Sequence, residues 1–455
     1  MHELFHRILE IRFGKRRNDS WRIVAVLLIS VMIASISGCG KPEKKDSRIH
    51  LRFACFAYKQ EADLAARLAA AFEKDHPNVK IDIEPIDGLD YQNKLAMQSA
   101  AGTLPDVVML ADALIPTLTS YKVLLDLKPF AQADKTFNLS DIYPQMLQAG
   151  MGDKGEIYMM PRELGVVVMF YNRTAFRKAG LPDPKPDWTY DEFLQMAKKL
   201  TIKDADGNIE QYGFYAPYAW SGFYSSWVES NGGKIVSKDH KKVMFDDPAV
   251  LKGLRSITDL VTKDSVAASP QQATTLSGTV SASGMDPFSI GKVAMMPQIF
   301  PQVAMFRTVI KKFDWDVQIL PRGTVSHVVC SGSAGYGISA DTKHPQEAWQ
   351  FVSFIARPEG QRIFASGGNG IPVLKSLRND PCWRKSGLPP ANLDAFIQST
   401  QFATGPRDRL ILDKPEVGDL ISAAFDDSFN SLRSTEDAFR EVSKKINKIL
   451  KEEEE

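Results

Sequence analysis

The stretch IHLRFACFAYKQEADLAARLAAAFEKDHPNVKIDIEP at residues 49–85 decides the fold. Its first ten residues are mostly apolar and predict a strand. Residues 61–74 place apolar side chains at i, i+4, i+7 and i+8, which predicts an amphipathic helix. Apolar and polar residues then alternate over 79–84 and predict a half-buried strand. A further helix is expected at 90–101, and DVVML at 106–110 predicts a strand buried on both faces. This order of elements indicates an α/β fold.

The same alternation continues toward the C-terminus. Thr189 is a suitable cap for a helix that begins near Trp188 and ends at Leu200. The other predicted elements are a strand at 165–172, short helices at 174–179 and 347–355, and two amphipathic helices near 417–425 and 438–450.

The composition is that of a folded protein with about two to four domains. The chain has 455 residues, of which 44% are hydrophobic and 24% charged, and its formal net charge is +1. These values exclude a disordered, collagen-like or polytopic membrane chain. No strongly basic domain occurs, so no nucleic-acid partner is expected.

The N-terminus has the pattern of a secretory signal. A run of Lys and Arg at 12–22 precedes the apolar stretch IVAVLLISVMIASI at 23–36. Those 14 residues are fewer than the roughly 20 that a membrane-spanning helix needs. The stretch ends in small residues, as signal peptides do. A short buried helix is the alternative, but the charged segment GKPEKK follows at once.

The end of this signal resembles the bacterial lipobox. In Ile36-Ser37-Gly38-Cys39, the resemblance implies that Cys39 becomes the lipid-bearing first residue of the mature chain. The alternative is an ordinary signal with a chance cysteine. We therefore expect a signal peptide at 1–38 and a polar tether at 39–47. Three further cysteines, at 55, 330 and 382, allow at most one disulfide and leave the pairing open.

Motifs for catalysis, metals or cofactors are missing from the sequence. After the expected signal peptide there is no HxH or HExxH pair, no GxSxG elbow and no phosphate-binding loop; the one HExxH match, HELFH at 2–6, lies within that signal. Asp204–Asn208 resembles a calcium loop, but its glycine is misplaced and Tyr215 stands where the loop needs glutamate, so we expect a turn. The sequence predicts no metal and no cofactor. With 55 acidic residues, a glycosidase carboxylate pair stays open.

The segment YGFYAPYAWSGFYSSW at 212–227 is unusually aromatic. Its rings are interleaved with Ser, Gly and Ala, whereas a core helix would use regularly spaced aliphatic residues. Flat amphipathic rings suit a ligand with apolar faces and polar edges, such as a sugar. The alternative is that the rings pack a helix against its own lobe. We expect that packing for most of them and ligand stacking for two or three.

A series of short motifs resembles the bacterial extracellular solute-binding proteins of family one, which supply sugars to ATP-driven ABC importers. The motifs run in order over residues 50–375: FEKDHPNV at 72–79, GTLPDVV at 102–108, DLKPF at 126–130, GEIY at 155–158, YNRTAFRKAGL at 171–181, WTYDEF at 188–193, GKVAM at 291–295, YGIS at 336–339 and PEGQ at 358–361. The resemblance implies an α/β, two-lobe periplasmic-binding-protein fold (type II-like) with a hinge and an interlobe ligand cleft.

The resemblance also implies lobe boundaries. The N-terminal lobe would hold residues 48–160 plus 315–368, and the C-terminal lobe 165–310 plus 372–455. Two loops depart from the family pattern. Residues 296–301 read MPQIFP where the family often has a glycine-rich loop, and 331–335 read SGSAG where it has Gly-Gly. The ligand is therefore expected to differ from the common oligosaccharides.

Ligand contacts are expected at the carboxyl ends of strands, where the cleft loops of such folds begin. The candidates for ring stacking are Tyr58, Trp220 and Trp227, the polar candidates are Asp112, Arg162, Glu163, Gln298 and Ser331, and Phe300 follows the strand that carries Gln298. Two alternatives stay open: Trp227 as a core residue, and Arg162 and Glu163 as partners of each other.

The resemblance implies a monomeric, non-enzymatic, lipid-anchored solute-binding protein of the cell envelope, facing the periplasm or the cell exterior. It would deliver a carbohydrate or related polyol to the permease subunits of an ABC importer. The first alternative is an exported carbohydrate-active enzyme that uses paired carboxylates. The second is an envelope scaffold without a small ligand.

Overall fold

The computed structural model describes residues 46–87, 91–152, 154–269, 272, 286–385, 387–404 and 409–454. The predicted signal peptide and Cys39 lie outside these residues. Among the described residues, no helix combines the length and the apolar character needed to cross a membrane.

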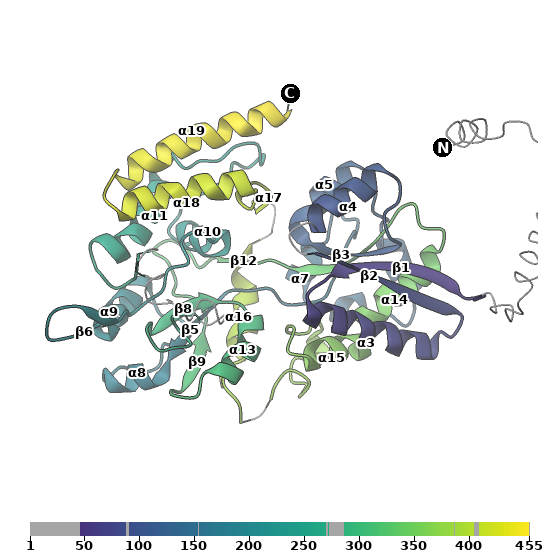
Figure 1. Ribbon diagram of the computed structural model, residues 1–455, viewed down its shortest axis with the longest axis horizontal. Coiled ribbons are helices and arrows are strands. Elements are labelled where there is room, and N and C mark those ends of the chain that lie inside the picture. Colours follow the sequence, from purple (N-terminus) through teal and green to yellow (C-terminus); the bar gives the residue numbers. More distant parts are fainter. Residues whose placement is uncertain are drawn as a thin grey trace, which may run out of the picture. The chain divides into compact units, whose positions relative to one another are not determined.

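The first lobe is built on a five-stranded sheet with the order β2-β1-β3-β11-β4. Strand β1 runs parallel to β2 and β3, whereas β11 is antiparallel to β3 and β4. Helices α4 and α5 lie on one side of this sheet, and α3 and α15 lie on the other (Figure 1). The elements are β1 (Ile49–Phe56), α3 (Lys59–Asp75), β2 (Val79–Ile86), α4 (Tyr91–Ala100), β3 (Val107–Ala111), α5 (Ile115–Ser120), α6 (Lys128–Ala133), α7 (Pro144–Gln148), β4 (Met160–Pro161), β11 (Ala334–Ile338), α14 (Pro345–Ala356) and α15 (Pro358–Ser366).

Aromatic packing joins helix α3 to the later helix α14. The apolar face of α3 ends in Phe72, which is fully buried. Its ring centroid lies 5.1 Å from that of Phe351 and 5.7 Å from that of Phe354. The predicted face of the helix at 61–74 thus packs against residues nearly 300 positions away in the sequence.

The second lobe is built on a three-stranded antiparallel sheet with the order β8-β5-β9. Helices α18 and α19 lie side by side near the C-terminus (Figure 1). The elements are β5 (Val168–Asn172), α8 (Arg173–Lys178), α9 (Tyr190–Leu200), β6 (Ile202–Lys203), β7 (Ile209–Gln211), α10 (Ser221–Ser230), α11 (Pro248–Thr262), β8 (Met295–Gln298), α13 (Pro301–Val309), β9 (Trp315–Gln318), α16 (Asp394–Ser399), α17 (Arg409–Leu412), α18 (Pro415–Phe429) and α19 (Thr435–Glu454). Strands β10 (Val329–Cys330) and β12 (Ala403–Thr404) form a separate parallel pair.

The predicted secondary structure is confirmed for every strand and helix named above, with ends that differ by a few residues. Thr189 caps α9 in a reciprocal arrangement: its hydroxyl oxygen accepts from the Glu192 N–H at 3.3 Å, and the Glu192 carboxylate accepts from the Thr189 N–H at 2.7 Å. Asp204 forms the expected turn, because its carboxylate accepts from the backbone N–H groups of Asp206 and Asn208. Among the described residues, Cys55 and Cys382 are free thiols.

Two stretches of chain belong to the opposite lobe from the one that the resemblance implies. Residues 315–318 were expected in the N-terminal lobe, but β9 pairs with β5 in the second sheet. Residues 372–377 were expected in the C-terminal lobe, but Leu374 bridges to Ile142 and Ser376 donates to the Asp141 carboxylate. The boundaries were wrong there because sequence motifs locate elements without showing which strand they pair with.

Candidate functional site

A pocket of about 250 Å³ is lined by residues from both lobes. It lies where the chain passes between the two sheets. Its walls come from loops after β3 and β8, from the start of α10 and from the connecting segments 163–167 and 330–334, with Gly370 adding a further contact. Four of the predicted site residues line it, namely Asp112, Glu163, Trp220 and Ser331.

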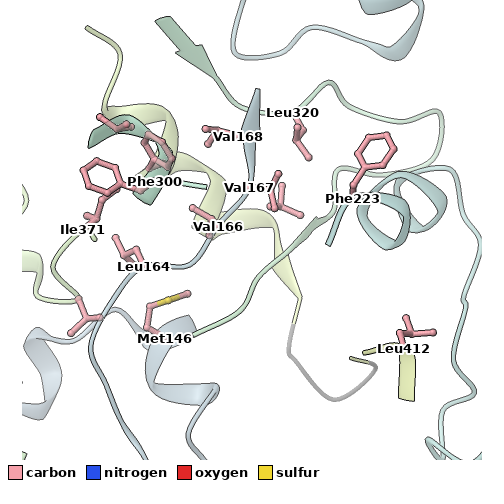
Figure 2. Close-up of a cluster of buried hydrophobic side chains, with 14 of the residues drawn as sticks. Met146, Leu164, Val166, Val167, Val168, Phe223, Phe300, Leu320, Ile371 and Leu412 are labelled. Carbon is pink, nitrogen blue, oxygen red and sulfur yellow. The ribbon is translucent and has the colours of Figure 1, made fainter. Parts of the chain in front are cut away.

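Two connecting segments approach each other at a pair of glycines. The Gly332 N–H donates to the Gly165 carbonyl at 2.9 Å, and Val166 and Ser331 form an antiparallel bridge. A Cβ added to Gly165 would lie 1.6 Å from the Gly332 oxygen, so this approach requires glycine. The segment is held by apolar side chains, and Figure 2 shows Leu164, Val166 and Val167 within a buried hydrophobic cluster.

Asp112 is fixed by Ser333, which belongs to the connecting segment 330–334. Its N–H donates to the Ser333 carbonyl at 2.9 Å, and its carboxylate accepts from the Ser333 N–H. Ser331, two residues earlier, donates its hydroxyl to the Thr404 carbonyl at 2.7 Å. These contacts join β3, the 330–334 segment and β12 at one wall of the pocket.

The side chain of Arg162 is more deeply buried than that of Glu163. The Arg162 guanidinium binds both oxygens of Glu61, with Nη1–Oε2 at 2.8 Å and Nη2–Oε1 at 3.1 Å, and its Nε lies 3.8 Å from Glu163 Oε1. Burial tends to lower the pKa of Arg162, but the carboxylates of Glu163 and Glu61 outweigh it and hold that pKa well above its usual value. Burial also raises the pKa of Glu163.

Glu61 is therefore the main partner of Arg162, and sequence reasoning missed it. The open alternative paired Arg162 with Glu163, and the structure shows only the longer contact between those two. Glu61 lies in the first turn of α3, 101 residues before Arg162, and no motif marks it. Glu163, and not Arg162, reaches the pocket.

Trp220 is partly exposed and lies at the N-terminal end of α10. Its ring lies over Gly222: a Cβ added there would be 2.7 Å from the Trp220 Cε2 atom. The absence of a side chain at Gly222 leaves room for the indole, and Gly222 also lines the pocket. Sequence reasoning missed this residue.

Trp227 belongs to the hydrophobic core. It is 5% exposed, and its Nε1–H donates to the Ser256 hydroxyl at 3.0 Å. Its ring lies within 5.4 Å of the rings of Tyr190, Phe193 and Phe223, measured between centroids. The prediction that Trp227 stacks on a ligand is not supported, and the alternative of a core residue describes it.

The three remaining candidates lie outside the pocket lining. Phe300 is 2% exposed and packs against Phe396 at 5.3 Å between ring centroids, so it offers no free face. The Gln298 side chain accepts from the next backbone N–H, that of Ile299, at 3.3 Å. Tyr58 is 59% exposed at the start of α3. A contact from Tyr58 or Gln298 to a ligand stays a prediction.

The described part of the chain contains no cluster of three or more His, Cys, Asp or Glu side chains that could hold a metal ion. The side chains that line the pocket include two carboxylates, two serine hydroxyls, one thiol, one indole ring and several apolar groups. Such a surface can accept hydrogen bonds and cover an apolar face.

The family model described as "Bacterial extracellular solute-binding protein" matches residues 58–362 of this chain. The chain belongs to this family. Among curated relatives, the galactooligosaccharide-binding protein of Bacillus subtilis is 23% identical, covering 79% of this chain and 82% of the relative. A protein of Streptomyces antibioticus named "Uncharacterized lipoprotein in oleD 5'region" is 25% identical, covering 78% and 77%.

Solved structures show the same fold for this solute-binding protein. An ABC substrate-binding protein from Listeria monocytogenes, in complex with cycloalternan, has a TM-score of 0.73 and 26% identity, covering 89% of this chain and 99% of that chain. The sugar-binding protein MalE from Xanthomonas citri has a TM-score of 0.76 at 19% identity, covering 89% and 98%. The family resemblance and the two-lobe α/β fold are thus confirmed.

Proposed function

We propose that this chain is a non-enzymatic solute-binding protein that captures a carbohydrate in the pocket between its lobes and delivers it to the permease of an ABC importer. The observation that carries the proposal is the pocket lining, in which both lobes place an indole ring, carboxylates and a hydroxyl around one space. Relatives whose names state sugar binding support the ligand class.

Each lining group has a distinct task in this proposal. The partly exposed ring of Trp220 covers the C–H face of a sugar. The carboxylates of Glu163 and Asp112 accept hydrogen bonds from sugar hydroxyls, which are strong when the acceptor is charged. Ser331 already donates to Thr404, so its oxygen is left to accept.

We further propose that the protein is exported and lipid-anchored through Cys39, and that it works as a monomer. The signal-like sequence at 1–38 and the residues 39–47 that would form a tether support this proposal. The name of the Streptomyces antibioticus relative supports it as well.

Ligand binding should close the two lobes. A ligand shifts an equilibrium between conformations only by its preference for one of them. Here Asp112 and Trp220 stand on different lobes, so a sugar that contacts both favours the closed form. Small-angle scattering should show a smaller radius of gyration with saturating ligand, and an unchanged curve would contradict the closure step.

The test of the proposed function is a thermal-shift screen of the mature protein against neutral oligosaccharides, polyols, glycerol phosphodiesters and amino acids. A ligand that binds only the folded state raises the melting temperature. We expect a shift with at least one saccharide and no hydrolysis of it on long incubation. Release of reducing sugar ends would instead favour the carbohydrate-active enzyme, and a shift with amino acids alone would refute a carbohydrate ligand.

A further inference from the structure

The described residues that line the pocket carry charge of one sign. Two of them, Asp112 and Glu163, are carboxylates, and none is Lys, Arg or His. The others are small or apolar residues, two serines, one cysteine and Trp220. A charged group on a ligand therefore meets negative side chains on this surface.

Arg162, the cation beside Glu163, is not available to a ligand. Its side chain is 7% exposed, and Glu61 occupies both terminal nitrogens. The face of the guanidinium lies 5.4 Å from the centroid of the Phe364 ring. The third donor, Nε, is buried and faces Glu163 Oε1 at 3.8 Å. An anion could therefore recruit Arg162 only by displacing Glu61 or Glu163, and a buried carboxylate left without its partner is strongly unfavourable.

Glu163 stands between Arg162 and the pocket. Its Oε1 is the carboxylate oxygen that faces Arg162 Nε at 3.8 Å, and its side chain is 18% exposed. Gly370 lies against its other oxygen, because a Cβ added at Gly370 would be 2.9 Å from Glu163 Oε2. Glu61, Arg162 and Glu163 together carry one positive and two negative charges. The positive charge of Arg162 is therefore already neutralised, with one negative charge left over.

The surroundings strengthen the effect of this charge on a ligand. The carboxylate is largely withdrawn from water, and charges interact more strongly where the dielectric constant is low. A phosphate or carboxylate beside Glu163 would be repelled. A hydroxyl or an ammonium group would instead donate a charge-assisted hydrogen bond.

We propose that the pocket selects its ligand by charge, with Glu163 accepting neutral or amine-bearing saccharides and rejecting those that carry a phosphate or a carboxylate. This inference rests on the proposed function and narrows its substrate class. It predicts that sugar phosphates and uronic acids are not cargo of this protein.

The test is a titration of the mature protein by calorimetry with three matched series built on glucose, galactose and mannose. Each series contains the neutral sugar, the 2-amino sugar, the 6-phosphate and the uronate. In any series that binds, the neutral and amino sugars should bind at least about a hundredfold more tightly than the two anionic ones. This ranking requires no variant, so it tests the inference whether or not a substituted protein folds.

A variant then assigns the selection to one residue. Glu163→Gln keeps the shape and removes the charge, and it should reduce the preference for neutral over anionic sugars at least about tenfold. Ser331→Ala is the matched control: it removes a polar lining group without changing charge, and it should alter the affinity for all members of a series alike.

The outcomes separate the two levels of the proposal. An anionic sugar that binds as tightly as its neutral counterpart would overturn charge selection and leave the solute-binding function standing. An unchanged preference in a folded Glu163→Gln variant would overturn the role of Glu163. If no saccharide binds here or in the thermal-shift screen, the carbohydrate ligand itself is wrong, and charge selection among sugars falls with it.

Discussion

Replacing Trp227 by alanine should destabilise the fold far more than replacing Trp220. Trp227 is 5% exposed, its ring is packed among other aromatic rings, and its indole N–H donates to Ser256. Truncating a buried tryptophan costs about 3–5 kcal/mol, and losing the hydrogen bond adds about 1 kcal/mol. The expected loss is therefore about 4–6 kcal/mol in the free energy of unfolding.

Trp220→Ala is the matched comparison, because Trp220 is the N-cap of α10 and Trp227 lies within the same helix. Trp220 is partly exposed and lines the pocket, so its removal should cost only about 1–2 kcal/mol of stability. It should weaken binding of a saccharide found by the thermal-shift screen about tenfold to a hundredfold.

Guanidinium unfolding followed by circular dichroism measures the loss of stability in each variant, and calorimetric titration measures the loss of saccharide affinity. The reasoning would be refuted by two variants of equal stability, because the structure assigns the two rings to different environments. A folded Trp220→Ala protein with unchanged saccharide affinity would show that the indole does not contact the ligand.

Further predictions concern the connecting segments and the cysteines. Gly165→Ala should lower stability by about 2–3 kcal/mol, because its Cβ cannot fit beside the Gly332 carbonyl. Gly418→Ala should instead raise stability by about 0.5–1 kcal/mol, because this helical glycine of α18 faces open space. Thermal unfolding of the two variants measures both effects. Burial raises the pKa of Cys55 to about 11, so iodoacetamide should modify it only slowly at pH 8 in the native protein and readily after denaturation. Cys39→Ser should abolish fatty-acid labelling, and a variant that is still cleaved normally and still held at the membrane would refute lipidation.

The secondary structure was predictable because its causes are local. The spacing of apolar residues in 61–74 and the capping pattern at Thr189 act within a few residues, and the structure has both features as expected. The order of the motifs gave the family and with it the two-lobe fold. The placement of β9 was not predictable in this way, because its pairing with β5 joins segments about 145 residues apart.

The candidate site was predictable in position but not in detail. Strand ends located Asp112, Glu163 and Ser331 at the pocket, since cleft loops begin there. The roles of Trp220 and Trp227 differ because of which neighbours surround each ring, and both lie in the same aromatic run. Glu61 has no sequence pattern, since its role depends only on the close approach of α3 to Arg162.

The position of β11 in the first sheet has a consequence for synthesis of the chain. It lies between β3 and β4, although it follows β3 by roughly 220 residues. At about 5–20 residues per second, the ribosome needs roughly 10–45 s to add them. Until β11 is present, the apolar edge of β3 has no neighbour on that side, so the first lobe stays incomplete. Fragments that end before residue 334 should consequently expose this edge and aggregate.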